Sequence, residues 1–105
     1  MANYYGISGL QTGKGRPVAP ASFAAAGGAE EVVLTWDDTL ADYDIMHIEW
    51  SLDDAAWTYL VGIGKDVETY THTGRTAATK YYYRARVVKR LKCTTYLTDD
   101  DTTAA

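Results

Sequence analysis

The chain has 105 residues, which is enough for one domain with a sizeable core and too few for two. Its formal charge is −4, and its one basic cluster, at residues 84–92, is interleaved with apolar side chains, so nucleic acid is not an expected partner. One cysteine, Cys93, excludes an internal disulfide, and no apolar run approaches membrane-spanning length, so we expect no membrane partner.

The first 16 residues are predicted to form an extended arm. They contain four glycines and little aliphatic surface, so they cannot bury enough apolar area to fold alone. They nevertheless carry apolar and aromatic side chains that are unusual in a tail facing solvent, and we predict these as protein-docking residues: Tyr4, Tyr5, Ile7 and Leu10. The arm begins without a basic region followed by an apolar run, so we expect no secretory signal.

Strands are predicted along the rest of the chain. Pro17 and Pro20 bracket the entry to a first strand at residues 20–25, because an edge strand can spare a backbone donor. Gly27 and Gly28 are predicted to turn the chain. Alternating apolar and polar residues then predict four more strands, at residues 31–37, 43–51, 57–61 and 67–72, with a glycine-containing turn at residues 62–66.

The clearest strand is predicted at residues 79–88, where side chains alternate between two faces. The inward face carries Tyr81, Tyr83, Ala85 and Val87. A short connection at residues 89–92 leads to a last strand at residues 93–98. The remaining residues, 99–105, are acidic and small, and we predict an exposed acidic tail. No helical periodicity of useful length is present.

Three sequence features together resemble a fibronectin type III domain. A tryptophan, Trp36, closes the second strand, the motif at residues 46–54 is followed by Trp57, and residues 79–85 contain a tyrosine-rich Thr-x-Tyr-x-Tyr-Arg pattern. The resemblance covers residues 17–98. It implies an all-β, seven-stranded fibronectin type III (immunoglobulin-like) β-sandwich. It also implies a core role for Trp36, Trp50 and Trp57, and a tyrosine corner at Tyr81, whose hydroxyl would bond backward to the backbone.

Sites for chemistry are not evident. The two histidines, His47 and His72, have no cysteine or second histidine at ligand spacing, so we expect both at the surface and no zinc. Acidic pairs in loops are interpreted as solvated turns rather than as a calcium site. No serine or cysteine lies in a nucleophile context, and Cys93 is expected to be a buried or half-buried inert side chain. We expect no enzyme activity, no metal and no cofactor.

Aromatic side chains that the core does not need are the remaining candidates: Tyr4, Tyr5, Tyr59, Tyr82 and Tyr96. Tyr82 should point outward beside Arg84 and Arg86, with His47 and Glu49 on the neighbouring strand. These residues predict a mixed aromatic and charged contact face. A solvated cross-strand ladder is the alternative interpretation.

The resemblance implies a binding or structural module. Fibronectin-like domains without a leader are frequent in bacteriophage particles, so our hypothesis is a capsid decoration protein, or a head or tail accessory subunit, made in the host cytoplasm and located in the virion. The arm would dock on capsid or tail subunits, with self-association in the assembly as a further option. The alternative hypothesis is a carbohydrate or host-surface binding module.

Overall fold

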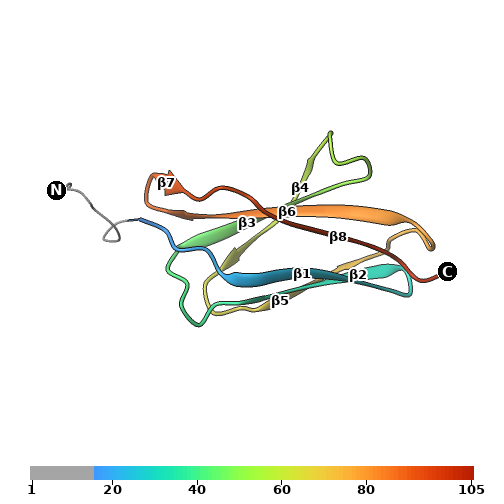
Figure 1. The fold of residues 1–105 in the computed structure, drawn as a ribbon, viewed down its shortest axis with the longest axis horizontal. Coiled ribbons are helices and arrows are strands. Elements are labelled where there is room, and N and C mark those ends of the chain that lie inside the picture. Colours follow the sequence, from blue (N-terminus) through green and yellow to red (C-terminus); the bar gives the residue numbers. More distant parts are fainter. Residues whose placement is uncertain (1–15) are drawn as a thin grey trace.

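The structure, a computed structural model, describes residues 16–105 and shows a sandwich of two β-sheets (Figure 1). The predicted docking residues of the arm, Tyr4, Tyr5, Ile7 and Leu10, lie outside the described residues. Among residues 16–105, no helix is long and apolar enough to cross a membrane.

In the part of the chain that the structure describes, eight strands form the two sheets, and every pairing between them is antiparallel. The strands are β1 (Ala21–Gly28), β2 (Glu31–Asp37), β3 (Ile45–Ser51), β4 (Thr58–Gly64), β5 (Thr69–Thr73), β6 (Lys80–Lys89), β7 (Lys92–Cys93) and β8 (Leu97–Thr102). One sheet has the order β1-β2-β5, and the other has the order β4-β3-β6-β7, with β8 also paired to β6. The predicted β-sandwich is confirmed, with eight strands instead of seven because the predicted last strand divides into β7 and β8.

The core is built by the alternation of side chains along the two central strands of the larger sheet and along β2. On β6, the face predicted to point inward is buried throughout its length. It packs with side chains from β2 and β3, so the core contains Val32, Leu34, Trp36, Met46, Ile48, Tyr81, Tyr83, Ala85 and Val87. Trp50 is partly buried and packs against this core.

Tyr81 joins β6 to the loop that precedes it. Its ring is buried, and its hydroxyl oxygen accepts a hydrogen bond from the backbone N–H of Thr76 at 2.9 Å. This is the backward bond that the resemblance to fibronectin type III domains implies for a tyrosine corner. This hydrogen bond fixes the path of the chain between β5 and β6, because a side chain of β6 satisfies a backbone N–H of the loop that joins the two strands.

We expect Tyr81→Phe to lower the free energy of unfolding by about 1–3 kcal/mol, because it leaves the Thr76 N–H without its acceptor while the ring stays buried. Urea unfolding of the purified chain measures this difference. Tyr70→Phe is the matched control, because the Tyr70 hydroxyl makes no hydrogen bond with other residues in 16–105. Equal stability of the two variants would contradict the role assigned to the Tyr81 hydroxyl.

Two predicted turns begin later than expected, and in each case the glycines lie inside a strand. Gly27 and Gly28 end β1, and the turn lies at residues 29–30. A side chain at Gly27 would overlap the backbone carbonyl of Thr102, so this glycine permits the close approach of β8. Gly62 and Gly64 lie in β4, and the turn follows at residues 65–66.

The predicted acidic tail is also wrong for residues 99–102, which belong to β8. Asp99 accepts a hydrogen bond from the Ala25 N–H at 2.8 Å, and Asp101 accepts one from the Gly27 N–H at 2.7 Å. The bond from Gly27 lowers the pKa of Asp101. Asp99 and Asp101 thus accept hydrogen bonds from backbone N–H groups of β1. Because β1 and β8 belong to different sheets, these bonds connect the two sheets along one edge of the sandwich.

Candidate functional site

Among residues 16–105, the solvent-facing side of the larger sheet gathers aromatic side chains that lie outside the core together with three basic side chains. Strand alternation places outward residues of β3, β4 and β6 next to residues that flank or form β8. We call this surface the outer face, and define it by His47, Glu49, Trp57, Tyr59, Lys80, Tyr82, Arg84, Arg86, Tyr96 and Asp100. It includes all three residues of the predicted contact face.

Arg84 occupies the centre of the outer face. Its Nε donates to Glu49 Oε1, on the adjacent strand, at 2.6 Å. Its guanidinium carbon lies 4.4 Å from the centroid of the Trp57 ring and 4.1 Å from that of Tyr96. The guanidinium therefore contacts a carboxylate and two rings from three other parts of the chain, an arrangement that holds all four side chains in place.

Trp57 consequently does not have the core position that the resemblance implies. It is half-buried just before β4, and its ring packs on Arg84 instead of on the buried cluster. The physical reason is register: Tyr59 pairs with Glu49, whose side chain points outward, so Trp57, two residues earlier, points outward as well. Trp36 and Trp50 do contribute to the core, as predicted.

A second row of the outer face runs beside the first. Arg86 stacks over Tyr96, with 4.9 Å from its guanidinium carbon to the ring centroid, and His47 is the partner of Arg86 across β3 and β6. His47 Nδ1 lies 3.3 Å from the hydroxyl of Tyr59, which is more than half exposed. A side chain at Gly62 would meet that hydroxyl, so the glycine makes room for Tyr59 to reach His47.

Tyr82 lies at the other end of the face. The Lys80 ammonium is 5.1 Å from the centroid of the Tyr82 ring and 3.5 Å from Asp100 Oδ1. The charge of Asp100 raises the pKa of Lys80. Tyr82 is half-buried, and its backbone pairs with that of Asp100. The structure thus places Tyr82, Arg84 and Arg86 on one surface, together with aromatic residues that the sequence did not group with them.

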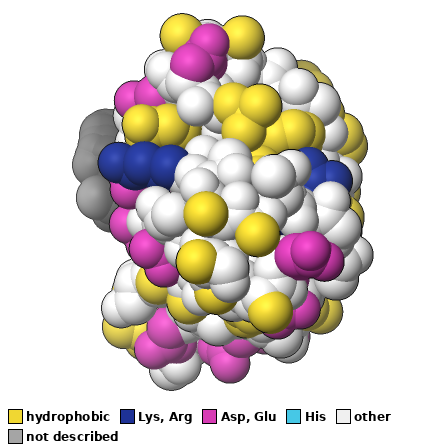
Figure 2. Space-filling view, turned by 90° about the vertical axis from the view of Figure 1, so that its right-hand side faces the viewer, with side chains coloured by type: hydrophobic (Ala, Val, Ile, Leu, Met, Phe, Trp, Pro, Cys, Tyr) yellow, Lys and Arg dark blue, Asp and Glu magenta, His cyan; other side chains and the backbone are white. Residues whose placement is uncertain are grey.

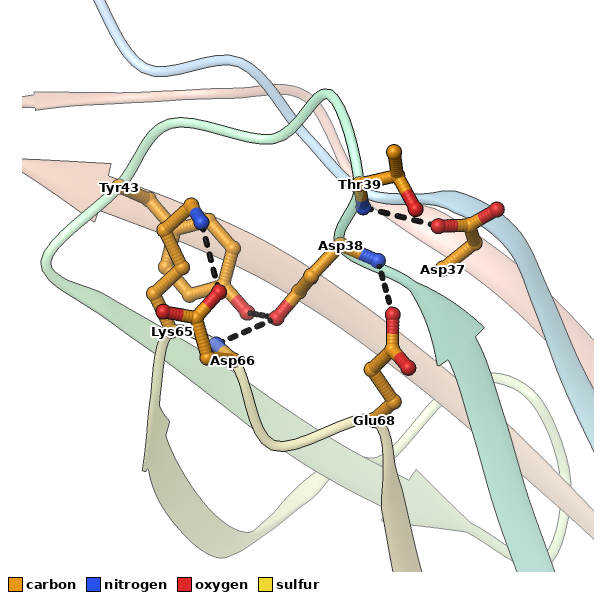
Figure 3. Close-up of polar contacts among 7 residues, drawn as sticks. All are labelled: Asp37, Asp38, Thr39, Tyr43, Lys65, Asp66 and Glu68. Atoms are coloured by element: carbon orange, nitrogen blue, oxygen red, sulfur yellow. Dashed lines mark hydrogen bonds and ion pairs between the residues drawn. The ribbon is translucent and has the colours of Figure 1, made fainter.

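A separate polar cluster fixes the loops at one end of the sandwich (Figure 3). Asp38 is 2% exposed, and its Oδ2 accepts hydrogen bonds from the Tyr43 hydroxyl at 2.7 Å and from the Asp66 N–H at 2.9 Å. The Asp38 N–H donates to Glu68 Oε2 at 2.8 Å. Burial, together with the adjacent Asp38 carboxylate, raises the pKa of Tyr43. Asp38 therefore ties the loop after β2 to the loop after β4.

The carboxylates of Asp37 and Glu68, near Asp38, accept hydrogen bonds from backbone N–H groups. They do not point together at a common site. Figure 3 shows that Glu68 accepts a hydrogen bond from the Asp38 N–H, and that Asp37 accepts one from the Thr39 N–H at 2.8 Å. Within residues 16–105, no group of three or more His, Cys, Asp or Glu side chains is arranged to hold a metal ion. This cluster shapes the loops, and we assign it no ligand.

His72 is buried, contrary to the surface position expected from the sequence. It is 6% exposed, its Nδ1 lies 2.8 Å from the Tyr83 hydroxyl, and its ring packs edge-on against Trp50. Burial lowers the pKa of His72 to about 4, and the nearby charge of Arg75 acts in the same direction. The histidine is thus a neutral core residue at pH 7.

Cys93 is exposed, which corrects the buried or half-buried position expected from the sequence. It lies in the two-residue strand β7, at the margin of the larger sheet, where it lines an open cleft with Arg16 and Lys92. The short pairing of β7 with β6 leaves this side chain on the surface.

The end of the sandwich that carries the C-terminus differs from the outer face. Figure 2 shows this end with acidic and basic side chains dispersed, and with apolar side chains in small groups separated by polar surface. The visible part of this end has no broad basic area.

Comparisons with known proteins support the fold. No family model and no curated protein matches the sequence. The chain is similar to part of a β-1,2-glucanase from Parabacteroides distasonis, with a TM-score of 0.73 and 20% identity over 85% of this chain, although it spans only 13% of the glucanase. It is also similar to the fn3 domain of human collagen alpha-1(XX) chain, with a TM-score of 0.73 and 18% identity, covering 92% of this chain and 93% of that one. A third structure, FN3tt, has a TM-score of 0.69 and 22% identity, over 84% and 95% of the two chains. The fold is that of a fibronectin type III domain.

Proposed function

We propose that this fibronectin type III-like sandwich is a non-enzymatic structural module that docks on other proteins of an assembly through its outer face. The observation that carries the proposal is the stack of Trp57, Arg84, Tyr96 and Arg86 across the face. Tryptophan, tyrosine and arginine are the residue types that dominate binding energy at protein interfaces. A fibronectin type III-like fold is consistent with a binding or structural role.

The outer face is also ordered before any partner arrives. Arg84 is held by Glu49 and by two rings, so its side chain loses little further freedom on binding. Association costs less when interface side chains are already immobilised. A solvated cross-strand ladder, the alternative interpretation of these residues, would not require aromatic side chains on both sides of the central arginine.

We propose further that the assembly is a bacteriophage particle, in which the chain serves as a capsid decoration protein or as a head or tail accessory subunit. The predicted arm supports this proposal by its composition, because Tyr4, Tyr5, Ile7 and Leu10 would add apolar contact area on a particle surface. An arm and a face that bind together give an avidity that neither provides alone. Under this proposal the partners are capsid or tail subunits, and the location is the virion.

Binding of the purified chain to particles from its source tests the proposal. We expect the wild-type chain to cosediment with particles in a gradient, and Tyr59→Ala combined with Tyr82→Ala to weaken binding by tenfold or more, because two rings of the face are lost. Leu91→Ala is the matched control, because this fully exposed side chain lies in the turn between β6 and β7. It should bind as the wild type does.

Each part of the proposal can fail separately. Wild-type affinity in the double tyrosine variant would reject the outer face as the docking surface. Deletion of residues 1–16 should leave a folded sandwich that no longer binds, and retained binding would reject the arm. Absence of the wild-type chain from the particle fraction would reject the particle as its assembly.

A carbohydrate or host-surface binding module is the second candidate function. The specific observation that favours it is Tyr59, which is 56% exposed and hydrogen-bonded to His47, so that an open ring lies next to polar groups. A ring with a polar neighbour can present both apolar and hydrogen-bonding surface to a sugar. Glycan-array binding that Tyr59→Ala abolishes, and that survives deletion of residues 1–16, would favour this function over particle docking.

A further inference from the structure

We propose that Arg86, together with His47, is the point on the outer face that binds a carboxylate side chain of the partner protein. This inference rests on the docking function proposed above and names the chemistry of the partner. The partner segment would present an aspartate or glutamate to Arg86, with apolar or aromatic neighbours that pack against the rings of Tyr59 and Tyr96.

The first observation is the pattern of ion pairs along β6. Four basic residues lie on this strand, and three of them have carboxylate partners: Lys80 with Asp100, Arg84 with Glu49, and Lys89 with Asp42. Among residues 16–105, Arg86 forms no ion pair. Arg86 is therefore the one basic residue of β6 without a carboxylate partner among the described residues.

The second observation is how Arg86 is held. Its side chain is half-buried and its guanidinium lies over Tyr96, yet it makes no hydrogen bond to another residue in 16–105. Stacking uses the plane of a guanidinium and leaves its N–H groups at the edge, where they match the two oxygens of a carboxylate. Arg86 is therefore positioned by one ring, with its donors free of other described residues.

The third observation is the row in which Arg86 lies. Tyr59, His47, Arg86 and Tyr96 follow one another across the sheet, and the carboxylates of the face are already paired with Arg84 and Lys80. The row contains donors and rings and no anion. A partner carboxylate bound in this row would be attracted by the charge of Arg86. It would be repelled only weakly by Glu49 and Asp100, because each of these carboxylates is already paired with a basic side chain.

The same charges favour a single carboxylate over a polyanion. A nucleic acid or a sulfated chain would need several unpaired cations, and on this face only Arg86 lacks a carboxylate partner among the described residues. The flanking rings instead suit a protein segment, in which one acidic side chain lies between apolar ones. A carboxylate-bearing partner protein is thus the occupant that the charge pattern fits.

Nitrogen-15 NMR of the full chain tests the assignment with two probe peptides, Ac-Tyr-Glu-Tyr-NH2 and Ac-Tyr-Gln-Tyr-NH2. We expect saturable shifts of the Arg86 Nε–H signal with the glutamate peptide, and binding at least tenfold weaker for the glutamine peptide, because a hydrogen-bonded charge pair is lost. Arg86→Gln should weaken glutamate-peptide binding about 10- to 100-fold. Arg86→Lys should restore part of it, because the charge returns without the paired donors.

Arg90→Gln is the matched control, because it makes the same change in charge at an exposed position in the turn after β6, and it should bind the glutamate peptide as the wild type does. Equal binding of the two peptides, equal losses in Arg86→Gln and Arg90→Gln, or no saturable shift at Arg86 would overturn the assignment. Particle cosedimentation keeps the two proposals separate. If the wild-type chain cosediments and the double tyrosine variant does not, while Arg86 does not respond to the peptide, docking through the outer face stands and the carboxylate assignment falls. If Arg86 responds while the wild-type chain stays at the top of the gradient, the carboxylate assignment stands and the particle proposal falls.

Discussion

Replacing Asp38 by alanine is expected to lower the free energy of unfolding by about 3–4 kcal/mol, although the residue lies in a loop. The carboxylate is buried and accepts hydrogen bonds from the Tyr43 hydroxyl and the Asp66 N–H, and bonds to a charged group contribute about 1.5–3 kcal/mol each. Alanine removes both acceptors and leaves the Tyr43 hydroxyl unpaired in a buried position. Chemical denaturation of the purified variant measures the loss.

Two comparisons identify the cause of that loss. Asp37→Ala changes the adjacent, exposed carboxylate, which hydrogen-bonds to Thr39, and should cost less than about 1 kcal/mol. Tyr43→Phe combined with Asp38→Ala should lose less than the sum of the single variants, because the unpaired hydroxyl is then absent. Strict additivity, or a loss at Asp38 no larger than at Asp37, would show that the cluster does not stabilise the loops as described.

The free energy of unfolding is expected to fall by about 3 kcal/mol between pH 6.5 and pH 4 because of His72. Burial lowers the pKa of His72 to about 4 in the folded chain, whereas an unfolded histidine has a pKa of about 6.5. Between these values the unfolded state binds more protons, so stability rises with pH. The contribution is therefore complete above pH 6.5 and is lost as the pH falls towards 4.

Urea unfolding at a series of pH values measures this slope. The groups around the His72 ring are the Tyr83 hydroxyl, the rings of Trp50 and Tyr81, and the guanidinium of Arg75. His72→Gln should flatten the slope between pH 6.5 and pH 5, whereas His47→Gln should retain it. A flat wild-type profile, or an unchanged slope in His72→Gln, would contradict a buried neutral histidine.

Much of the sandwich can be predicted from the sequence, because one face of each central strand is apolar. Residues 79–88 alternate so regularly that the buried face of β6, including Tyr81, follows directly. The bond from Tyr81 to the preceding loop is implied instead by the resemblance to fibronectin type III domains. The ends of the strands are harder to predict from the sequence. Gly27 and Gly62 indicate turns by composition, but the structure uses them where β8 or Tyr59 approaches closely, which no local pattern encodes.

The aspartates at residues 99–101 are a second case in which local sequence does not predict the structure. Three consecutive aspartates predict an exposed tail, because carboxylates are rarely strand residues. In the structure, Asp99 and Asp101 accept hydrogen bonds from backbone N–H groups of β1, a strand more than 70 positions earlier in the sequence. The burial of His72 is hidden from the local sequence for a related reason, since the rings that bury it come from β3 and β6.

The candidate site could be predicted in part. Alternation alone places Tyr82, Arg84 and Arg86 on the solvent side of β6, and Tyr59 and Tyr96 are identifiable as aromatic residues that the core does not need. The position of Trp57 depends on the register between β3 and β4, which shifts at Ile48–Glu49. The stacked contacts of Arg84 and Arg86 therefore required the three-dimensional structure.

The central claim is that the outer face is covered by other proteins in the assembly. Hydroxyl-radical footprinting of gradient fractions, with mass spectrometry of the modified tyrosines, tests it directly in comparison with the free chain. We predict that oxidation of Tyr59 falls sharply in the particle fraction, while oxidation of Leu91, which is exposed off the face, stays as it is in the free chain. Equal oxidation of Tyr59 in particle-bound and free chain would show that the face remains open to solvent, and would contradict the claim.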